Sequence, residues 1–248
     1  MFGKLFLISL FVWIISFFMT QGMPSEKQIR SELYQEPIQN IKEYKPFRVD
    51  YEGGSSNITP IADYELWGVV VSHNDPSVWY RFDITHDKKS LDTRDICVGW
   101  GENLRRDGYR KMSFFNNDYT CNYEYNKDVS YFNPAQFSNN HLITDKSTIR
   151  SQIAKINTGD QIHIKGRLVN YSEDRWNGWY RNSSTNRTDE GNGACEIIFV
   201  DSIEILSPYR SIWHKINYYA KYTTLTSVLL AVLRVFFTHR RYVLPVQS

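Results

Sequence analysis

Residues 158–171 read TGDQIHIKGRLVNY, a short turn followed by an alternating run with one glycine inside it. Alternation with a period of two predicts a strand whose apolar side chains share one face and whose basic side chains share the other. These two sets are Ile162, Ile164 and Leu168, and His163, Lys165 and Arg167. Gly166 falls among the inward positions, where a missing side chain lets a strand bend sharply, as at the corner of a small closed barrel. The run therefore predicts a barrel strand.

Further segments with the strand period flank this run on both sides. They are rich in β-branched and aromatic residues, and Asn-Asn-Asp at 116–118 predicts the turn of a hairpin inside one of them. The segments are YELWGVVVSHN (64–74), VWYRFDIT (78–85), DICVGWG (95–101), GYRKMSFFNNDYTCNYEY (108–125) and ACEIIFVDSIEIL (194–206).

One internal helix is predicted over STIRSQIAKIN at 147–157, where Ile149, Ile153 and Ile156 recur at helical spacing. Thr144 or Asp145 can cap it. The helix stands directly before the glycine-containing strand. This order of elements predicts a mainly β protein, an OB-like Greek-key barrel over residues 62–207 with its helix before the fourth strand. An α+β sandwich is the alternative.

The first 23 residues, MFGKLFLISLFVWIISFFMTQGM, place a single Lys4 before an uncharged apolar run. This layout is typical of an export signal, and an uncleaved N-terminal membrane anchor is the alternative. Either one delivers the following chain across a membrane. Residues 24–61 then predict a linker with a short helix, since Ser25 can cap a turn there.

Residues 208–248 predict a C-terminal membrane helix at about 222–237 and a basic tail. Within that helix Arg234 is the single charge, and it lies close enough to the end for its side chain to reach the membrane surface. Aromatic residues precede the apolar run and Arg240 and Arg241 follow it, which predicts a cytoplasmic C-terminus. Because Lys4 is also expected in the cytoplasm, residues 24–207 are expected on the far side of the membrane.

The formal net charge is +2, but it is unevenly distributed. Residues 65–206 carry 17 Lys/Arg and 20 Asp/Glu, a net −3, whereas residues 207–248 carry 6 Lys/Arg and no acidic residue. A domain that binds phosphates normally carries the basic excess itself. Nucleic acid is therefore not expected as a partner.

Three cysteines, Cys97, Cys121 and Cys195, are too far apart in sequence for a zinc ribbon. In an oxidising compartment they allow one disulfide and one remaining thiol, and three pairings are open. The six histidines show no metal-ligand spacing, and Asn139, Asn140 and His141 are interpreted as capping residues before the helix. We expect no metal and no cofactor.

Several segments together resemble a family of uncharacterised bacterial envelope proteins with an N-terminal signal or anchor. The resemblance covers residues 58–206. It implies a fold class and a compartment, the bacterial inner membrane with the main domain in the periplasm, and it implies no established activity. The segments are ITPIADYELWGVVVSHN (58–74), DICVGWGEN (95–103), FSNNHLI (137–143), GDQIHIKGRLVNY (159–171) and SSTNRTDEGNGACEIIFVDSIEIL (183–206).

The loop before the last predicted strand is the candidate ligand site, because in OB-like barrels that loop lines the ligand face. Aromatic and arginine side chains there could stack on a ligand, although the same residues could simply pack a long hairpin on the barrel. The candidate residues are Trp176, Trp179, Arg181, Arg187 and Asp189.

We expect a membrane-anchored protein whose main domain binds another envelope component, most simply a protein. The sequence contains no catalytic motif, so it leaves enzyme activity open without supporting it. Two alternatives remain: single-stranded nucleic-acid binding, and a hydrolytic, nuclease-like barrel. The hydrolytic alternative requires Arg181, Arg187, Asp189 and Glu196 to converge on one pocket.

Overall fold

A computed structural model describes residues 2–20, 22–74, 90–117, 120–125, 127–174, 179–189, 191, 193–209 and 212–240. The chain divides into two compact units. One consists of Met1–Gly22 and Arg210–Ser248, and the other is Met23–Tyr209. The predicted strand at 78–85 lies outside the described residues.

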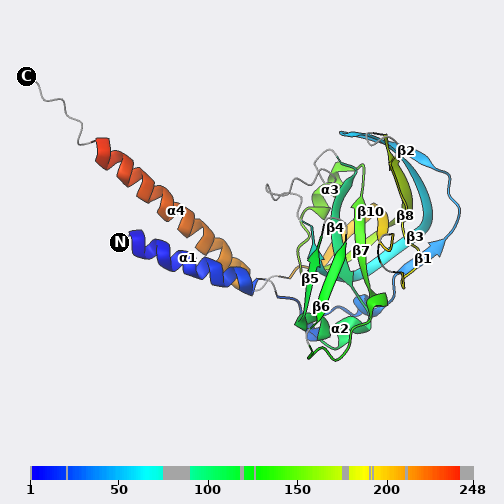
Figure 1. The fold of residues 1–248 in the computed structure, drawn as a ribbon, viewed down its shortest axis with the longest axis horizontal. Coiled ribbons are helices and arrows are strands. Elements are labelled where there is room, and N and C mark those ends of the chain that lie inside the picture. The colour runs from blue at the N-terminus through cyan, green and yellow to red at the C-terminus, as the bar shows by residue number, and fades with distance from the viewer. Residues whose placement is uncertain are drawn as a thin grey trace, which may run out of the picture. The chain divides into compact units, whose positions relative to one another are not determined.

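The larger unit is built around a closed barrel of five strands (Figure 1). The order around the barrel is β3-β4-β7-β10-β8, and β8 pairs with β3 to close it. Only β7 and β10 run parallel among these pairs. The mainly β class is thus confirmed. The five strands are β3 (Gly54–His73), β4 (Asp92–Gly99), β7 (Phe137–Ile143), β8 (Gln161–Glu173) and β10 (Glu196–Ser207).

Inward side chains of all five strands fill the barrel with apolar residues, among them Leu66, Ile96, Leu142, Ile164 and Ile198. The helix α3 (Ser147–Ile153) packs on this core, as its isoleucine spacing predicts. Ile153 and the following Ile156 are almost completely buried. Alternation along each strand leaves a second, outward face, which other elements cover.

The outward face of the barrel is covered by shorter elements. The hairpin of β5 (Met112–Asn116) and β6 (Cys121–Tyr125) confirms the expected turn region between two strands. β1 (Ile38–Ile41) and β2 (Phe47–Tyr51) pair with β3, and β9 (Trp179–Arg181) pairs with β8. The short helix α2 (Glu102–Arg105) follows β4.

Residues 24–61, expected as a linker with a short helix, pack on the barrel. They form two 3₁₀ turns, Glu26–Gln28 and Ser31–Tyr34, then β1, β2 and the start of β3. Leu33 is completely buried beside β3 and β4. Ile29 and Leu33 lie at helical spacing, which predicts the short helix, but this spacing does not show that Leu33 packs against distant strands.

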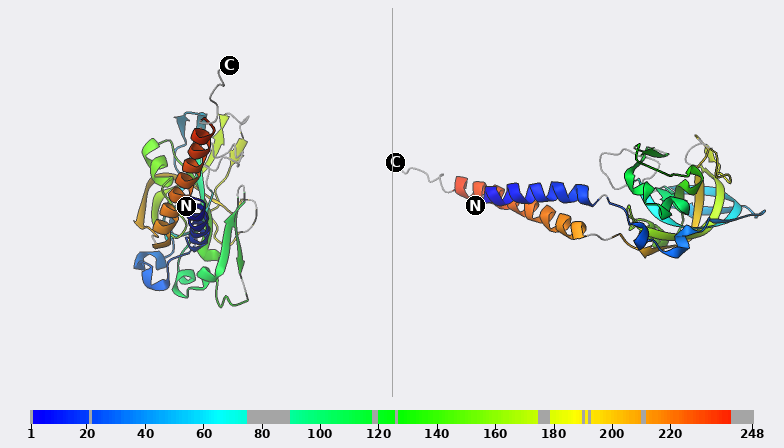
Figure 2. Two further views of the ribbon diagram at one scale, coloured as in Figure 1. Left: turned by 90° about the vertical axis from the view of Figure 1, so that its left-hand side faces the viewer. Right: turned by 90° about the horizontal axis from the view of Figure 1, so that it is seen from below.

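The smaller unit contains α1 (Phe2–Met19) and α4 (Ile212–Arg240), which pack against each other (Figure 2). Ile212–Phe237 is long and apolar enough to cross a membrane, and its 18-residue apolar window has a mean hydropathy of 1.4. It begins ten residues before the expected start at 222, so the tyrosines that precede the apolar run belong to the same helix. Gly3–Met19 is a shorter apolar helix.

We expect Gly166→Ala to destabilise the barrel. A Cβ at this position would lie 2.3 Å from the carbonyl oxygen of Phe199 on β10, so the two strands would have to move apart. Overpacking of this kind costs about 2 kcal/mol. Gly99→Ala is the matched control, because a Cβ there meets its nearest atom at 3.9 Å. Chemical denaturation of the purified full chain checks both variants, and equal stabilities would contradict the prediction.

Candidate functional site

A buried polar cluster lies on the outward face of β4 and β7. The register of these two strands places Asp95 directly opposite His141 and Cys97 opposite Asn139. Since Ile96 belongs to the barrel core, its neighbours in sequence point outward. The outward face of these two strands therefore carries a row of polar and sulfur-containing side chains.

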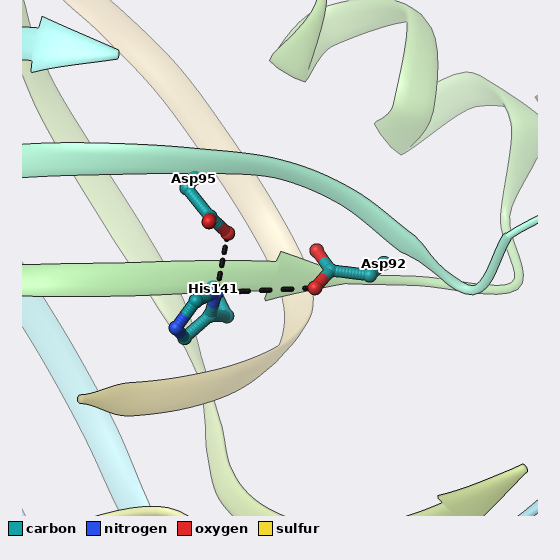
Figure 3. Close-up of side chains that lie close together, drawn as sticks. All are labelled: Asp92, Asp95 and His141. Carbon is teal, nitrogen blue, oxygen red and sulfur yellow. Dashed lines mark hydrogen bonds and ion pairs between the residues drawn. The ribbon is translucent and has the colours of Figure 1, made fainter. Parts of the chain in front are cut away.

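His141 is held between two carboxylates (Figure 3). Its Nδ1 forms a short hydrogen bond with Asp95 Oδ1 and lies 3.8 Å from Asp92 Oδ2. All three side chains are at most 3% exposed. Two carboxylates removed from water are costly unless a positive charge compensates them.

Arg181 of β9 supplies a compensating charge. Its Nη1 lies 3.5 Å from Asp92 Oδ2, and its Nη2 lies 2.5 Å from His141 Nε2. The side chain is only 16% exposed. The guanidinium therefore contributes a fixed positive charge to a network that is otherwise acidic.

One ligand atom each from Asp92, Asp95 and His141 lies within 4.8 Å of the others, a spacing that could hold a metal ion. However, the direct hydrogen bond between His141 and Asp95 leaves no room for an ion, which needs about 2.0–2.2 Å to each ligand atom. Arg181 already provides the positive charge. We therefore treat the cluster as a hydrogen-bonded charge network.

The neighbours of His141 act on it in opposite directions. Burial lowers the pKa of the ring, but the Asp95 carboxylate outweighs burial and raises it to about 9. Arginine can only donate hydrogen bonds, so its 2.5 Å contact with Nε2 favours the neutral ring and lowers the pKa. Asp95 acts in the opposite direction and favours the charged ring. His141 is thus held between one group that favours its neutral form and one that favours its charged form.

A pocket of about 530 Å³ opens next to this cluster. The β5–β6 hairpin, the segment leading into β7 and the loop before β10 form its walls. Its lining combines polar and apolar surface and contains four asparagines. The main lining residues are Asn122, Tyr123, Asn133, Phe137, Asn139, Asn186, Arg187, Asp189, Cys195 and Glu196.

Glu196 is the buried titratable group of this pocket. Burial raises its pKa to about 8, although Arg187 acts in the opposite direction from 3.7 Å. Its side chain is 5% exposed, and Oε2 has no hydrogen-bond partner among the described residues. A protonated carboxyl group therefore lines the pocket at neutral pH.

Tyr64 and Trp100 of the barrel unit hold the side chain of Arg187 in place. Its Nη1 donates to the hydroxyl of Tyr64 at 3.2 Å, and its guanidinium lies 5.3 Å from the ring centres of Tyr64 and Trp100. Asp189 accepts a hydrogen bond from Ser184 Oγ at 2.6 Å. These contacts hold Arg187 against the barrel and join Asp189 to Ser184 within the loop.

The cysteines join the pocket to the buried cluster. Cys97 and Cys121 form a disulfide, which selects one of the three open pairings. Cys195 lies outside it, and its Sγ accepts a hydrogen bond from Asn139 Nδ2 at 3.3 Å. The same Asn139 Nδ2 lies 3.4 Å from His141 Nε2. Cys195 therefore belongs both to the pocket wall and to the network behind it.

The residues predicted from the loop fall into three groups. Arg187 and Asp189 line the pocket, and Glu196 joins them. Arg181 does not line it and lies in the buried cluster instead. Trp176 is outside the described residues, and Trp179 is described only through its backbone pairing with Glu173. Three of the four residues required by the hydrolytic alternative therefore converge on one pocket.

The interpretation of His141 as a capping residue was wrong, because His141 is completely buried on a strand. Asp92 and Asp95 were not singled out at all. Forty-six residues separate Asp95 from His141, so no local spacing marks the pair. The segment FSNNHLI gives no alternating signal either, because four consecutive polar residues separate Phe137 from Leu142.

No family model, curated protein or solved structure matches this chain. The fold and the pocket therefore carry the functional argument.

Glu196→Gln should change how stability depends on pH. With a folded-state pKa near 8 and an ordinary value of 4.5, Glu196 favours folding fully below pH 4.5, and this contribution is lost as the pH rises through 8. Wild type and variant should therefore melt at similar temperatures at pH 5, whereas the variant should melt higher at pH 9. Thermal melts of the full chain at both pH values test this, and a constant difference would contradict it.

Proposed function

We propose that this chain is a membrane-anchored envelope protein whose OB-like domain binds a polypeptide segment of another envelope protein in the pocket beside β7. The single observation that carries the proposal is the pocket itself, whose wall includes Glu196, a buried residue with one carboxyl oxygen that lacks a partner among the described residues. A buried polar atom of this kind is costly unless a ligand satisfies it.

The strand order supports an OB-like identity for the barrel. Numbered along the chain, the five strands close in the order 1-2-3-5-4, with the third and fifth parallel. α3 lies between the third and fourth strands. In such barrels the second and third strands and the loop before the last strand contact ligands. The pocket uses the third strand, β7, and that same loop.

The chemistry of the lining favours a polypeptide. Side-chain amides both donate and accept hydrogen bonds, as the peptide backbone does, and Asn122, Asn133, Asn139 and Asn186 present them to the pocket. Tyr123 and Phe137 add apolar surface. Against a polyanion, Asp189 offsets the charge of Arg187, which makes single-stranded nucleic acid a poorer fit.

Contacts between α1 and α4 support an N-terminal anchor that is retained. Asn217 Nδ2 donates to the Trp13 carbonyl at 3.3 Å and to Ser16 Oγ at 3.2 Å, and Thr224 Oγ1 donates to Ser9 Oγ at 3.0 Å. Small and hydroxyl-bearing residues at a helix seam are the usual means of pairing helices in lipid. A signal that is removed would not need such a seam.

The pairing also supports the proposed topology. Ser9 contacts Thr224 and Ser16 contacts Asn217, so the two helices run antiparallel. Lys4 and the basic residues after α4 then fall on one side, which the positive-inside rule assigns to the cytoplasm. The barrel unit would lie on the opposite side, in the periplasm if the chain is bacterial.

A photo-crosslinking residue in place of Tyr123 should capture a partner in intact cells. Tyr180 is the matched control, since it is a tyrosine 53% exposed on β9 that does not line the pocket. Arg187→Gln in the Tyr123 background should reduce the adduct about tenfold, the loss expected for a charged hydrogen bond. Identical adducts from both positions would refute binding in the pocket.

The helix pair predicts a specific crosslink. In a Cys195→Ser background, the pair Ser9→Cys and Thr224→Cys should form a disulfide in membranes under mild oxidation, because their hydroxyl groups are 3.0 Å apart. Ser9→Cys with Leu225→Cys is the control, since Leu225 is 49% exposed.

Intact-mass spectrometry of the wild-type protein should find residues 2–22 still attached. A mature chain that begins near residue 23 would exclude the anchor.

A further inference from the structure

Residues 23–39, which we call the arm, are held on the barrel unit by a series of contacts. Leu33 is completely buried and packs with apolar residues of β3 and β4. The side-chain amide of Gln161 binds the arm backbone with both of its polar atoms. Its Oε1 accepts from the Arg30 N–H and its Nε2 donates to the Gln28 carbonyl, each at 2.8 Å. Because Gln161 is itself buried, water does not compete for these bonds. The arm is therefore docked along its length.

Glu36, near the end of the arm, binds the segment that leads into β7. Its Oε1 accepts from Gln136 Nε2 at 2.6 Å, and its Oε2 accepts from Trp100 Nε1 at 2.8 Å. Gln136 lies between Ala135 and Phe137, which both line the pocket. Hydrogen bonds to a carboxylate are stronger than those between neutral groups. Glu36 thus connects the arm firmly to one wall of the pocket.

Gln39 of β1 binds a second wall, the loop before β10. Its Nε2 donates to the Thr185 carbonyl at 2.8 Å, and its Oε1 accepts from Arg187 Nη2 at 3.4 Å. Arg187 lines the pocket and lies over the ring of Trp100. Trp100 is therefore in contact with Arg187 and with Glu36, so the two arm residues act on the same structure from two sides.

The arm connects wall segments that do not bind each other directly. Within the part of the chain that the structure describes, no hydrogen bond joins residues 133–137 to residues 185–189. Packing of Leu33 and binding by Gln161 are what any docked segment shows, and they need no functional explanation. Glu36 and Gln39 differ from these two residues, because their partners belong to the walls of the pocket or support one of them.

We propose that Glu36 and Gln39 are positioning residues that hold the two pocket walls, and that docking of the arm is coupled to binding in the pocket. The coupling rests on the proposed function, whereas the positioning of the walls does not depend on a partner. Coupling of this kind is reciprocal, so a bound polypeptide segment also stabilises the docked arm. Since residues 20–22 alone separate the arm from α1 in the chain, the arm is the direct covalent route from the pocket to α1.

Hydrogen exchange of the detergent-solubilised full chain, read by mass spectrometry, tests the positioning by Gln39. Gln39→Ala should raise the exchange rate of residues 183–189 about fivefold, the factor expected when one hydrogen bond is lost. Residues 133–137 should exchange as in wild type, because Gln39 does not contact them. Asn40→Ala is the matched control, since Asn40 is the exposed neighbour of Gln39 on the same strand.

Glu36→Ala should raise the exchange rate of both wall segments, because it removes the bond to Gln136 and the bond that supports Trp100 beneath Arg187. Exchange of α3 is the internal reference, since a local effect leaves this helix unchanged. Wall segments that exchange equally in wild type and in both variants overturn the positioning role. Faster exchange throughout the unit, with α3 included, also overturns it, because the two residues then act on general stability.

The coupling is tested with the photo-crosslinking residue in place of Tyr123. Adding Gln39→Ala should reduce the adduct in intact cells about fivefold, again the factor for one hydrogen bond, and adding Asn40→Ala should leave it unchanged. An equal adduct with Gln39→Ala refutes the coupling, while the binding function stands. If the chain with an unaltered arm gives no adduct, the polypeptide partner and the coupling both fail, and hydrogen exchange still decides whether Glu36 and Gln39 position the walls.

Discussion

The pairing of β3 with β8 closes the barrel, and the rest of the larger unit depends on it. The two strands pair from Ser56 opposite Glu173 to Val69 opposite Gln161. Closure removes the exposed edges that open sheets must protect and encloses the apolar core on all sides. Gly166 lies in this seam, where the backbone of β10 comes closer than any side chain would allow. The outward face of the barrel carries smaller apolar clusters and, on β4 and β7, polar groups.

The candidate site depends on the separation between the inner and outer faces of the barrel. The register that buries Ile96 and Leu142 inside the barrel aligns Asp95 with His141 outside it. Because surrounding elements exclude water from this outer layer, each charge there acts strongly on its neighbours. Arg181 reaches the layer from the strand next to β8 and balances the acidic groups. A rigid, charged layer thus lies directly behind a pocket wall that contains Cys195.

The parts of the fold that could be predicted from sequence are those with a periodic signal. The alternation around Gly166 and the isoleucine spacing of α3 are local patterns, and both elements form where they were expected. The packing of residues 24–61 could not be read, since burial of Leu33 depends on distant strands. The residues of the candidate site show the same difference between local patterns and distant contacts. Arg187 and Asp189 were identified from one loop, whereas the cluster around His141 exists only through strand register.

Asn139 separates two sulfur-containing groups that would otherwise be neighbours. Its Oδ1 lies 3.2 Å from Cys121 Sγ, and its Nδ2 donates to Cys195 Sγ at 3.3 Å. Exchange between a thiol and a disulfide requires the attacking sulfur to reach a sulfur of the bond directly. With the planar amide in the way, the Cys97–Cys121 bond is shielded from scrambling by Cys195. One asparagine therefore lets an oxidised pair and a reduced thiol coexist in the same small space.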